Sequence, residues 1–319
     1  MKIANAKSAL TFRMRPKPPF RLDLTVWALR RRARNVVDTW DGSVYRRVLV
    51  PDGVPLAVSV HQVGSIESPS LIVTANAPPH FHSSIARLLT RMLGTHVDLD
   101  PFYDMARRDR RLAPLVEQFR GVKPPRFPTI FEAFVNAVAC QQLSLTVGIE
   151  LLNRLAVHFG LAAATDEQGQ HAFPRPEDVV QIDPNHFRQL GFSYNKARSI
   201  LELANLIVSG RLDARALEQV NNPIALQYLN GLRGVGRWTA EYVLLRGLGR
   251  IDVFPGDDVG ARNRLTTWLR RRDELNYEAV ERILTRWRPF AGLVYFHLLL
   301  AGLAESGEVV HAGTAQLSA

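Results

Sequence analysis

The residues of this chain that could carry chemistry lie close together in residues 228–265. Two adjacent carboxylates, Asp257 and Asp258, precede a segment with helical spacing that contains Arg262 and Arg264. A helix N-terminus favours the ionised form of an acid, so this pair is better suited to stabilising positive charge in a substrate than to donating a proton. For the segment alone, two simpler interpretations stay open: both aspartates cap the helix, or Asp258 pairs with Arg262.

Upstream of the aspartates, two amphipathic segments are joined through a glycine-containing turn at residues 232–236. Glycine has no β-carbon, so its backbone can take unusual dihedral angles and approach a phosphate closely, and the N–H groups that open the next helix point at that anion. Gly234 and Gly236 are therefore candidate phosphate-binding residues, although an ordinary helix–helix turn also explains a bare Gly-x-Gly. The neighbours of the turn favour phosphate binding: Arg233, Arg237 and Thr239.

Two aromatic residues, Trp238 and Tyr242, follow the turn. Because they are four residues apart, they share one face of the expected helix. A positively charged ring stacked on such electron-rich groups gains about 0.5–2 kcal/mol from cation–π attraction. Both residues are therefore candidates for a binding pocket, and packing in the core is the alternative.

The composition narrows the class of protein and its partner. The 319 residues carry a formal net charge of +10, which favours an acidic partner such as nucleic acid without identifying one. The only cysteine, Cys140, excludes disulfides within the chain and cysteine-held zinc or iron–sulfur sites. No apolar run suits a secretory signal or a bilayer span, so we expect a cytoplasmic protein without a membrane partner.

The elements that must position these residues divide into a strand-rich part and a helix-rich part. Residues 23–76 are rich in Val, Leu and Tyr, carry turn signals, and contain strand-length segments at 45–50 and 56–63, so they predict an antiparallel sheet. From residue 83 onward the apolar spacing is predominantly helical.

Several helices are predicted in the second part. Thr129 followed by Glu132 forms a capping-box signal before a helix over residues 131–142. Apolar spacing and stop signals predict the other segments: helices over 146–158 and 195–209, a loop over 162–170, helical turns over 176–190, and a buried helix over 290–304.

The predicted fold class is therefore α+β, with an amino-terminal antiparallel sheet domain followed by a mostly helical core. The expected divisions of the chain are a flexible basic tail over 1–20, an α+β domain over 21–100, the helical core over 101–305 with the hairpin at about 224–247, and a flexible tail over 306–319.

In these features the chain resembles the helix-hairpin-helix DNA glycosylase superfamily, and within it the bacterial alkylbase glycosylases of the 3-methyladenine DNA glycosylase II type. Besides the hairpin and its downstream aspartate, the following groups carry the likeness: Phe131-Glu132-Ala133, Gln141-Gln142-Leu143-Ser144, Leu190-Gly191-Phe192-Ser193, Lys196-Ala197, and Arg286-Trp287-Arg288-Pro289 with His297. The resemblance covers residues 100–304 well, and it covers the amino-terminal sheet mainly in its expected architecture.

The resemblance implies a chemistry for the aspartate pair. Breaking an N-glycosidic bond builds positive charge on the deoxyribose, and the family's catalytic aspartate aligns with Asp258. Relatives that also cut the strand use a lysine nucleophile, which would fall at Trp238. Tryptophan cannot form an imine, so the resemblance implies a monofunctional enzyme without lyase activity.

The resemblance also implies how damaged DNA is held. Trp238 and Tyr242 would stack on the alkylated base, while the family's additional aromatic on the last helix is replaced by Leu299. Gln142 aligns with the side chain that fills the gap left by the flipped base, unless it simply ends a helix. Lys196, with the arginines of the hairpin, would contact phosphates.

The implied function is excision of 3-methyladenine and related N3- or N7-alkyl purines from double-stranded DNA in base excision repair, by a monomer that requires no cofactor. A structural Na⁺ or K⁺ would bind the backbone carbonyls of Asn230, Leu232 and Val235. Two alternatives stay open: a glycosylase for a neutral lesion such as uracil or hypoxanthine, and a non-catalytic helix-hairpin-helix DNA-binding protein.

Overall fold

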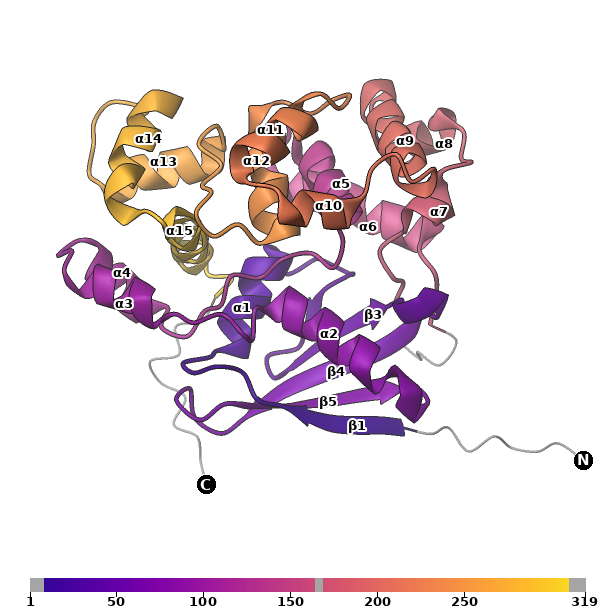
Figure 1. The fold of residues 1–319 in the computed structure, drawn as a ribbon, viewed down its shortest axis with the longest axis horizontal. Helices are drawn as coiled ribbons and strands as arrows, with labels where there is room; N and C mark the ends of the chain where they lie inside the picture. The colour runs from indigo at the N-terminus through magenta and orange to yellow at the C-terminus, as the bar shows by residue number, and fades with distance from the viewer. Residues whose placement is uncertain (1–8, 164–168, 310–319) are drawn as a thin grey trace, which may run out of the picture.

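The amino-terminal part of the chain forms a five-stranded antiparallel sheet. The computed structural model describes residues 9–163 and 169–309. The strands are β1 (Ala9–Met14), β2 (Thr39–Trp40), β3 (Val44–Leu49), β4 (Leu56–Val63) and β5 (Ser70–Asn76), arranged in the order β1-β5-β4-β3-β2 (Figure 1). In β5, the alternate residues Leu71, Val73 and Ala75 are buried, as expected for a strand with one face on the core.

Two helices pack with this sheet. Helix α1 (Leu22–Arg30) follows β1, and α2 (His82–Leu93) follows β5 and lies in front of the sheet in Figure 1. The buried residues Ile85, Leu89 and Met92 of α2 are spaced so that they lie on one face of the helix, and they join the cluster that contains the inward side chains of the sheet.

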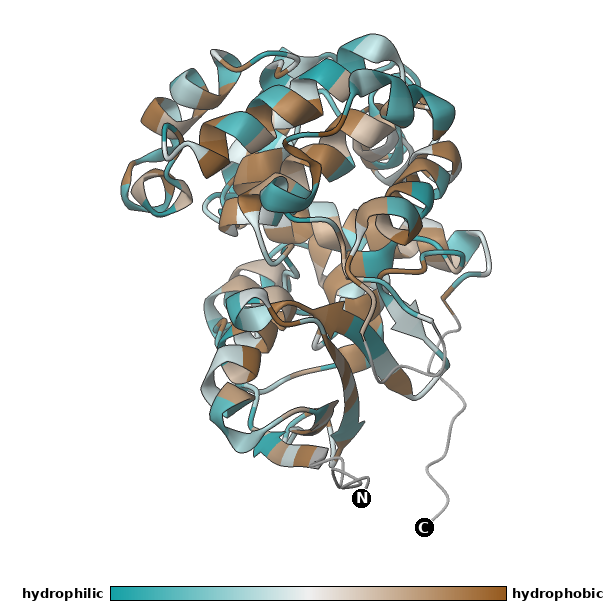
Figure 2. Ribbon diagram, turned by 90° about the vertical axis from the view of Figure 1, so that its right-hand side faces the viewer, coloured by the Kyte–Doolittle hydropathy of each residue, from teal (hydrophilic) through white to brown (hydrophobic). Residues whose placement is uncertain are grey.

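The rest of the chain is helical and lies above the sheet in Figures 1 and 2. Its helices are α3 (Asp100–Arg107), α4 (Leu112–Gln118), α5 (Ile130–Cys140), α6 (Leu145–Phe159), α7 (Pro176–Val179), α8 (Pro184–Gln189), α9 (Tyr194–Val208), α10 (Ala214–Gln219), α11 (Asn222–Asn230), α12 (Arg237–Val243), α13 (Val259–Trp268), α14 (Tyr277–Leu284) and α15 (Ala291–Glu305). A π-helical segment, Leu244–Leu248, continues α12.

Two hydrophobic clusters tie the sheet domain to the helical core. One joins the inward face of the sheet to α5, α6 and α9. The other joins α1, α3 and α4 to α13, α14 and α15. Because α1 contributes to both clusters, its C-terminal end is held firmly against the helical core.

The α+β class and the main predicted elements are confirmed. The strand segments predicted at 45–50 and 56–63 correspond to β3 and β4, and the helices that begin at His82, Ile130, Leu145 and Tyr194 lie within a residue or two of the predicted limits. The helical turns over 176–190 appear as α7 and α8, and α15 is the buried helix expected over 290–304. The predicted loop over 162–170 lies partly outside the described residues.

Three local predictions are wrong. The flexible tail expected over residues 1–20 is wrong in its described part, because Ala9–Met14 forms β1 and pairs with β5. The first residues of the expected sheet region, Leu22–Arg30, form α1 instead. The tail expected over 306–319 is wrong at residues 306–309, since Glu308 forms an ion pair with Arg32 (3.5 Å) and Val309 is buried; the remaining residues of both expected tails lie outside the described ranges. The proposed domain limits at residues 100 and 101 stay predictions.

The capping box before α5 is only half confirmed. The Thr129 hydroxyl accepts a hydrogen bond from the backbone N–H of Glu132 (3.1 Å), as predicted. The Glu132 carboxylate does not return to the backbone of Thr129. It accepts from buried Arg47 of β3 instead (2.7 and 2.6 Å). The same guanidinium also forms an ion pair with Asp38 (2.7 Å).

No single helix of the described ranges 9–163 and 169–309 is long and apolar enough to cross a membrane. The segments Tyr277–Trp287 and Ala291–Glu305 reach the necessary length and apolar composition only together, and they meet at an angle of 108°.

Candidate active site

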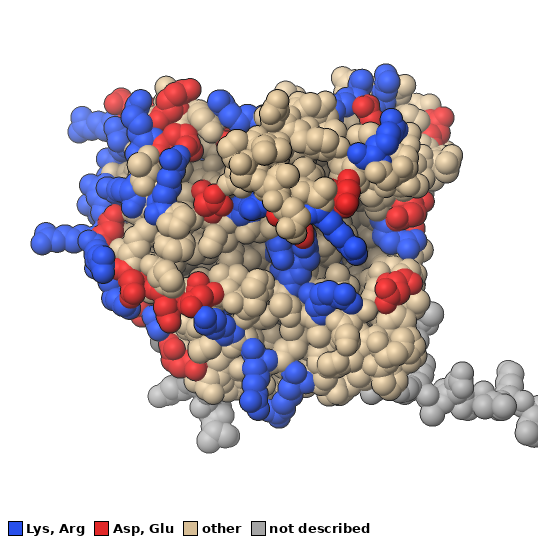
Figure 3. Space-filling model, viewed as in Figure 1, with Lys and Arg blue, Asp and Glu red and all other residues tan. Residues whose placement is uncertain are grey.

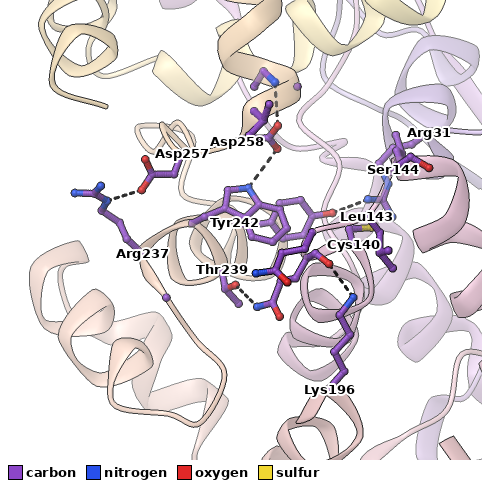
Figure 4. Close-up of a pocket in the computed structure, with 18 of the residues that line it drawn as sticks. Arg31, Cys140, Leu143, Ser144, Lys196, Arg237, Thr239, Tyr242, Asp257 and Asp258 are labelled. Atoms are coloured by element: carbon purple, nitrogen blue, oxygen red, sulfur yellow. Dashed lines mark hydrogen bonds and ion pairs between the residues drawn. The ribbon is translucent and has the colours of Figure 1, made fainter. Parts of the chain in front are cut away.

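A cavity of about 1140 Å³ opens where the hairpin, the loop after α5, the start of α13 and helix α15 come together. Figure 4 shows part of its lining, with Asp257 and Asp258 arriving from one side and Lys196 and Leu143 from another. The N-terminal domain also reaches this cavity through Arg31, which follows α1. The site is therefore built by segments from both parts of the chain.

Asp258 is the N-cap residue of α13 and lines the cavity. Its Oδ1 accepts from the backbone N–H of Ala261 (2.9 Å), while its Oδ2 accepts from Trp238 Nε1 (3.4 Å) and from the Tyr295 hydroxyl (3.2 Å). The capping interpretation is therefore correct for one oxygen of Asp258, and it is wrong for Asp257, which pairs with Arg237 (2.7 Å). Within the described residues no ion pair joins Asp258 to Arg262, whose backbone N–H donates to the Asp258 carbonyl (2.8 Å).

Tyr295 is a site residue that the sequence analysis missed. It is buried in α15 and lies one turn before Leu299, which lines the cavity as expected. Burial, followed by the nearby Asp258 carboxylate, raises the pKa of Tyr295 well above its ordinary value, so the hydroxyl stays protonated and donates to Asp258. A tyrosine within an otherwise apolar helix was the available signal. The pocket therefore has an aromatic residue from α15 after all.

The loop before α13 is fastened to α12 by residues on either side of Trp238. Arg237 Nε donates to Asp257 Oδ2 (2.7 Å), and its guanidinium lies 3.6 Å from the centre of the Tyr277 ring. The backbone N–H of Gly256 donates to Glu241 Oε2 (3.0 Å). With the Trp238 bond to Asp258, three consecutive loop residues are each bonded to α12.

Glu241 is a second residue that the sequence analysis missed. It is 4% exposed, and its other oxygen accepts from the Tyr277 hydroxyl of α14 (2.7 Å). Burial raises the pKa of Glu241 to about 7, even though the Tyr277 and Gly256 hydrogen bonds oppose the shift. A β-carbon on Gly256 would lie 2.8 Å from the Tyr277 ring, so this position needs glycine. The only sequence signal was an acid one helical turn after Arg237.

The predicted aromatic pair lies in the cavity. The ring centres of Trp238 and Tyr242 are 5.7 Å apart and their planes are tilted by 41°. Trp238 is half-buried, whereas Tyr242 is buried and packs toward the core near Phe127. Trp238 thus offers an accessible ring, and Tyr242 offers mainly the edge that carries its hydroxyl, which accepts from Arg31 Nη1 (3.0 Å).

The hairpin turn has the glycine geometry that the sequence predicted at one of two positions. Gly234 has φ +74°, and a β-carbon there would lie 2.3 Å from Ser199 Oγ of α9. Gly236 is the N-cap residue of α12 with φ −99°, and a β-carbon there would meet nothing within 4 Å. Gly234 is therefore required for packing, while the role of Gly236 beside a phosphate stays a prediction.

Three residues expected to contact DNA are held by other protein groups. Arg237 is paired with Asp257, as described above. Thr239 is buried, and its hydroxyl accepts from Gln141 Nε2 (2.9 Å). Lys196 Nζ donates to the carbonyls of Ala139 (3.1 Å) and Gln141 (2.8 Å) at the end of α5. In this structure these three side chains shape the site; both hairpin arginines are exposed, and Arg237 is held by Asp257.

The loop after α5 projects into the cavity mouth. Gln142 is exposed and has φ +56°, a conformation that is uncommon for residues other than glycine. Leu143 beside it is 44% exposed. Gln141 anchors the loop by donating to the Gly234 carbonyl (2.9 Å). The residue predicted to fill the gap thus lies on a strained, anchored loop that lines the cavity, beside an exposed apolar residue, and its role stays a prediction.

The described residues contain no group of three or more His, Cys, Asp or Glu side chains that could hold a metal ion. The cation predicted in the hairpin would use backbone oxygens instead. Of its three expected ligands, the Leu232 carbonyl accepts a hydrogen bond from the N–H of Val235 (3.2 Å). These carbonyls lie at the end of α11 and in the turn that follows.

The part of the chain that carries this site matches a known protein family. Residues 135–289 match the model of the HhH-GPD superfamily, described as base excision DNA repair proteins. The matched segment contains the hairpin, the fastened loop and Asp258.

Similar sequences carry related names. The chain is 29% identical over 201 residues to a DNA-3-methyladenine glycosylase of Bacillus subtilis (strain 168), covering 63% of this chain and 66% of the relative. It is 28% identical over 178 residues to DNA-3-methyladenine glycosylase 2 of Escherichia coli (strain K12), covering 56% and 60%. The chain thus spans about two thirds or less of the length of these relatives.

A solved structure extends the likeness to the sheet domain. The 3-methyladenine DNA-glycosylase of Archaeoglobus fulgidus superposes with a TM-score of 0.82 at 25% identity, covering 94% of this chain and all of that chain. The amino-terminal sheet and the helical core are therefore arranged as in that protein.

Proposed function

We propose that this chain, whose helical core belongs to the HhH-GPD superfamily of base excision DNA repair proteins, is a DNA glycosylase that hydrolyses the N-glycosidic bond of damaged bases. The observation that supports the proposal most directly is that the two carboxylate oxygens of Asp258 have different roles. One carboxylate oxygen caps α13, and the other is presented to a large cavity by two neutral donors, Trp238 and Tyr295.

Asp258 would act on the sugar. As the base departs, positive charge develops on the deoxyribose, and a preorganised carboxylate stabilises that charge without reorganising. Fastening of the loop to α12 supports this role, because it fixes Asp258 before the substrate arrives. Whether Asp258 also orients the attacking water is part of the same proposal.

The absence of strand cleavage is a separate part of the proposal. By the resemblance to the family, the lysine of relatives with lyase activity would fall at Trp238, and an indole cannot form a Schiff base. The lysine that lines the cavity within the described residues is Lys196, and its ammonium group is held by two carbonyls of α5. We therefore expect base release to leave an intact abasic site.

Double-stranded DNA would bind across the hairpin and the cavity mouth. Arg233 and the N–H groups at the start of α12 would contact the backbone, while Gln142, or Leu143 beside it, would fill the gap left by the flipped nucleotide. A monovalent cation on the carbonyls of Asn230, Leu232 and Val235 would support the turn.

The substrates would be alkylated purines, chiefly 3-methyladenine and its N3- and N7-alkyl relatives. The names of the similar proteins point to this class, and the accessible ring of Trp238 suits a cationic base. A duplex carrying one 3-methyladenine or 7-methylguanine, incubated with the protein and then cleaved with alkali at abasic sites, tests the activity. Borohydride should trap no covalent complex. A trapped complex would overturn the monofunctional assignment, and absence of release from every lesion would overturn the glycosylase assignment.

A further inference from the structure

The exposed face of α13 leads away from the mouth of the cavity. Val259 and Gly260, in the first turn of the helix, line the cavity and are exposed. Asn263 and Thr267 follow at spacings of three and four residues and are exposed too, so they lie on the same face. The sequence of α13 contains no acidic residue, and its 10 residues extend about 15 Å. This face is therefore an uncharged path from the cavity to the far end of the helix.

The path ends at three consecutive arginines, Arg270, Arg271 and Arg272. All three are exposed, and none of them forms an ion pair with a carboxylate in the part of the chain that the structure describes. The two acids that follow, Asp273 and Glu274, are exposed as well and leave this turn with a net positive charge. The far end of α13 thus presents free guanidinium groups to the solvent.

The backbone at Arg270 is unusual for a residue with a side chain. Arg270 follows Leu269, the C-cap of α13, and has φ 54°, in the left-handed region. Its N–H donates to the Thr267 carbonyl (2.9 Å), and the N–H of Arg271 donates to the Thr266 carbonyl (3.0 Å). A helix end with these two hydrogen bonds usually has glycine at this position, because a side chain there costs folding free energy. Presentation of a cation to a ligand accounts for an arginine at such a position.

A second group of arginines lies beside the first. Arg111, which precedes α4, donates through Nη1 to the Leu269 carbonyl (2.9 Å), so the turn between α3 and α4 is held against the end of α13. Arg108 and Arg110 of this turn are exposed. Asp109 between them accepts from the backbone N–H of Arg111 (2.9 Å). Figure 3 shows Lys and Arg side chains gathered on this side of the molecule, which is formed by α3, α4, α13 and α14.

We propose that these arginines bind the phosphate backbone of duplex DNA on one side of the damaged nucleotide. The arginine patch consists of Arg108, Arg110, Arg270, Arg271 and Arg272. The inference rests on the proposed function, which brings DNA to the cavity, and it adds a second contact about 15 Å away, or about four to five base pairs along the duplex.

The chemistry of the patch suits phosphate. A guanidinium group donates two parallel hydrogen bonds to phosphate oxygens. Contacts of this kind contribute affinity and position the duplex without reading its base sequence. An acidic protein would match the charge as well, but the face of α13 is continuous with the cavity mouth. DNA is therefore the favoured partner, because one duplex can contact both ends of the helix.

The first test measures binding to duplexes that carry a stable abasic-site analogue, so that it does not depend on base release. The analogue lies about three base pairs from one end or from the other end of a duplex of about 25 base pairs, and only one of these placements supplies phosphates to the patch. Arg270→Gln, Arg271→Gln and Arg272→Gln together should raise Kd by about tenfold or more for one duplex and by less than about twofold for the other. For the first duplex, the slope of log Kd against log salt should fall by about 2–3.

The sheet domain supplies a matched control with the same change in charge. Arg13, Arg15 and Arg87 are exposed residues in and beside β1 and α2, and together Arg13→Gln, Arg15→Gln and Arg87→Gln also remove three cations. This control should change Kd by less than about twofold, and equally for both duplexes. A loss in the patch variant that is equal for both duplexes, or no larger than in the control, would overturn the proposal and leave an acidic protein as the partner of the patch.

Arg270→Gly separates binding from folding. Glycine suits the left-handed backbone at this position, so the midpoint of thermal unfolding should not fall. The affinity for the first duplex should nevertheless fall by about threefold, since one phosphate contact is lost. Unchanged affinity for that duplex would overturn the part assigned to Arg270.

The unaltered protein separates this proposal from the proposed function. If it released no damaged base, the proposed function would be overturned. If it released damaged bases while the patch variant bound both duplexes as tightly as the control variant does, only the arginine patch would be overturned. Base release by the unaltered protein, with a loss of affinity for one duplex alone in the patch variant, is the result that supports both.

Discussion

Two buried arginines in this molecule, Arg47 and Arg31, have opposite surroundings. Arg47 of β3 donates to Asp38 (2.7 Å) and to Glu132 (2.6 Å), and all three side chains are 5% exposed or less. The Tyr45 hydroxyl also donates to Asp38 (2.7 Å). Arg31 is buried to a similar degree, but its guanidinium donates to a hydroxyl and an amide oxygen.

The difference shows how the chain uses buried charge in structure and in binding. Around Arg47 each charged group has an oppositely charged partner, and the ion pairs join the sheet to α5 without leaving a group for a ligand. Around the cavity, the cation of Arg31 and the anion of Asp258 stay apart, so each is available for a different part of a substrate. Figure 3 shows a third arrangement, in which Lys and Arg gather with acidic residues over α13 and α14 on the exposed surface.

The largest effect on stability is expected at the buried ion pairs of Arg47 with Asp38 and Glu132. Glu132→Ala leaves Arg47 with Asp38 alone in a buried site, so the free energy of unfolding should fall by about 3–5 kcal/mol. Urea denaturation measures this loss, and base release per folded molecule should not change.

The surface offers a matched control for that variant. Glu67 pairs with Arg120 (3.0 Å), but its side chain is 56% exposed, so Glu67→Ala should cost less than about 1 kcal/mol. If Glu132→Ala lowered the free energy of unfolding no more than Glu67→Ala does, the buried ion pairs of Arg47 would not stabilise the contact between the sheet and α5.

The sequence predicts the local part of the site and misses the long-range part. Trp238, Asp258 and the hairpin lie within one segment, so helical spacing and resemblance were enough to bring them together. Arg31 contacts Tyr242 across 211 residues of sequence, and nothing in the arginine-rich segment 30–34 distinguishes it from its neighbours. Its position depends on the packing of α1 between two hydrophobic clusters.

The same reason explains the errors in the fold. Strand β1 is short and borders basic and proline-containing residues, which suggested a tail. Its stability comes from pairing with β5, as in Leu10 with Ala75, and this partner cannot be recognised from local composition. Glu132 was assigned to a local capping box because its partner Arg47 lies in another domain.

A pH-dependent effect is expected at Glu241, a buried acid whose partners are neutral. Its two oxygens accept best from Gly256 and Tyr277 when the carboxylate is ionised, so kcat should fall about tenfold as pH drops from 8 to 6, through the pKa of about 7. The charged groups around it are Arg237 and the carboxylates of Asp257 and Glu281. Glu241→Gln should remove this dependence on pH.

The ionisation of Glu241 affects the free energy of unfolding in the direction opposite to its effect on kcat. Its pKa is raised from 4.5 to about 7, so the folded state binds more protons than the unfolded state between these values. Its contribution to stability is present below pH 4.5 and is lost as pH rises through 7, by about 3 kcal/mol at most. Urea unfolding at pH 5 and 8 should show a smaller difference in Glu241→Gln. An unchanged kcat profile in that variant would show that the hydrogen bond from Gly256 to Glu241 does not help to position Asp258.

The smallest effect on kcat is expected at Arg237, the exposed residue of α12 that holds the loop before α13. Arg237→Ala removes the hydrogen bond to Asp257. Because the Arg237 side chain is 49% exposed, kcat should fall by only about threefold. Arg233→Ala, at an exposed position in the turn, should instead raise KM and reduce the salt dependence of DNA binding. Identical effects of the two variants on kcat and KM would remove the distinction between loop positioning and phosphate contact.

The most direct test of the account is Asp258→Asn compared with Asp257→Asn. The amide oxygen can still accept from the N–H of Ala261, so α13 keeps its cap while the charge beside the sugar is lost. Base release should fall by about 10³-fold in Asp258→Asn, with DNA affinity changed less than about threefold, and by less than about tenfold in Asp257→Asn. Release by Asp258→Asn at more than about a tenth of the unaltered rate would contradict the central claim that this carboxylate drives the reaction.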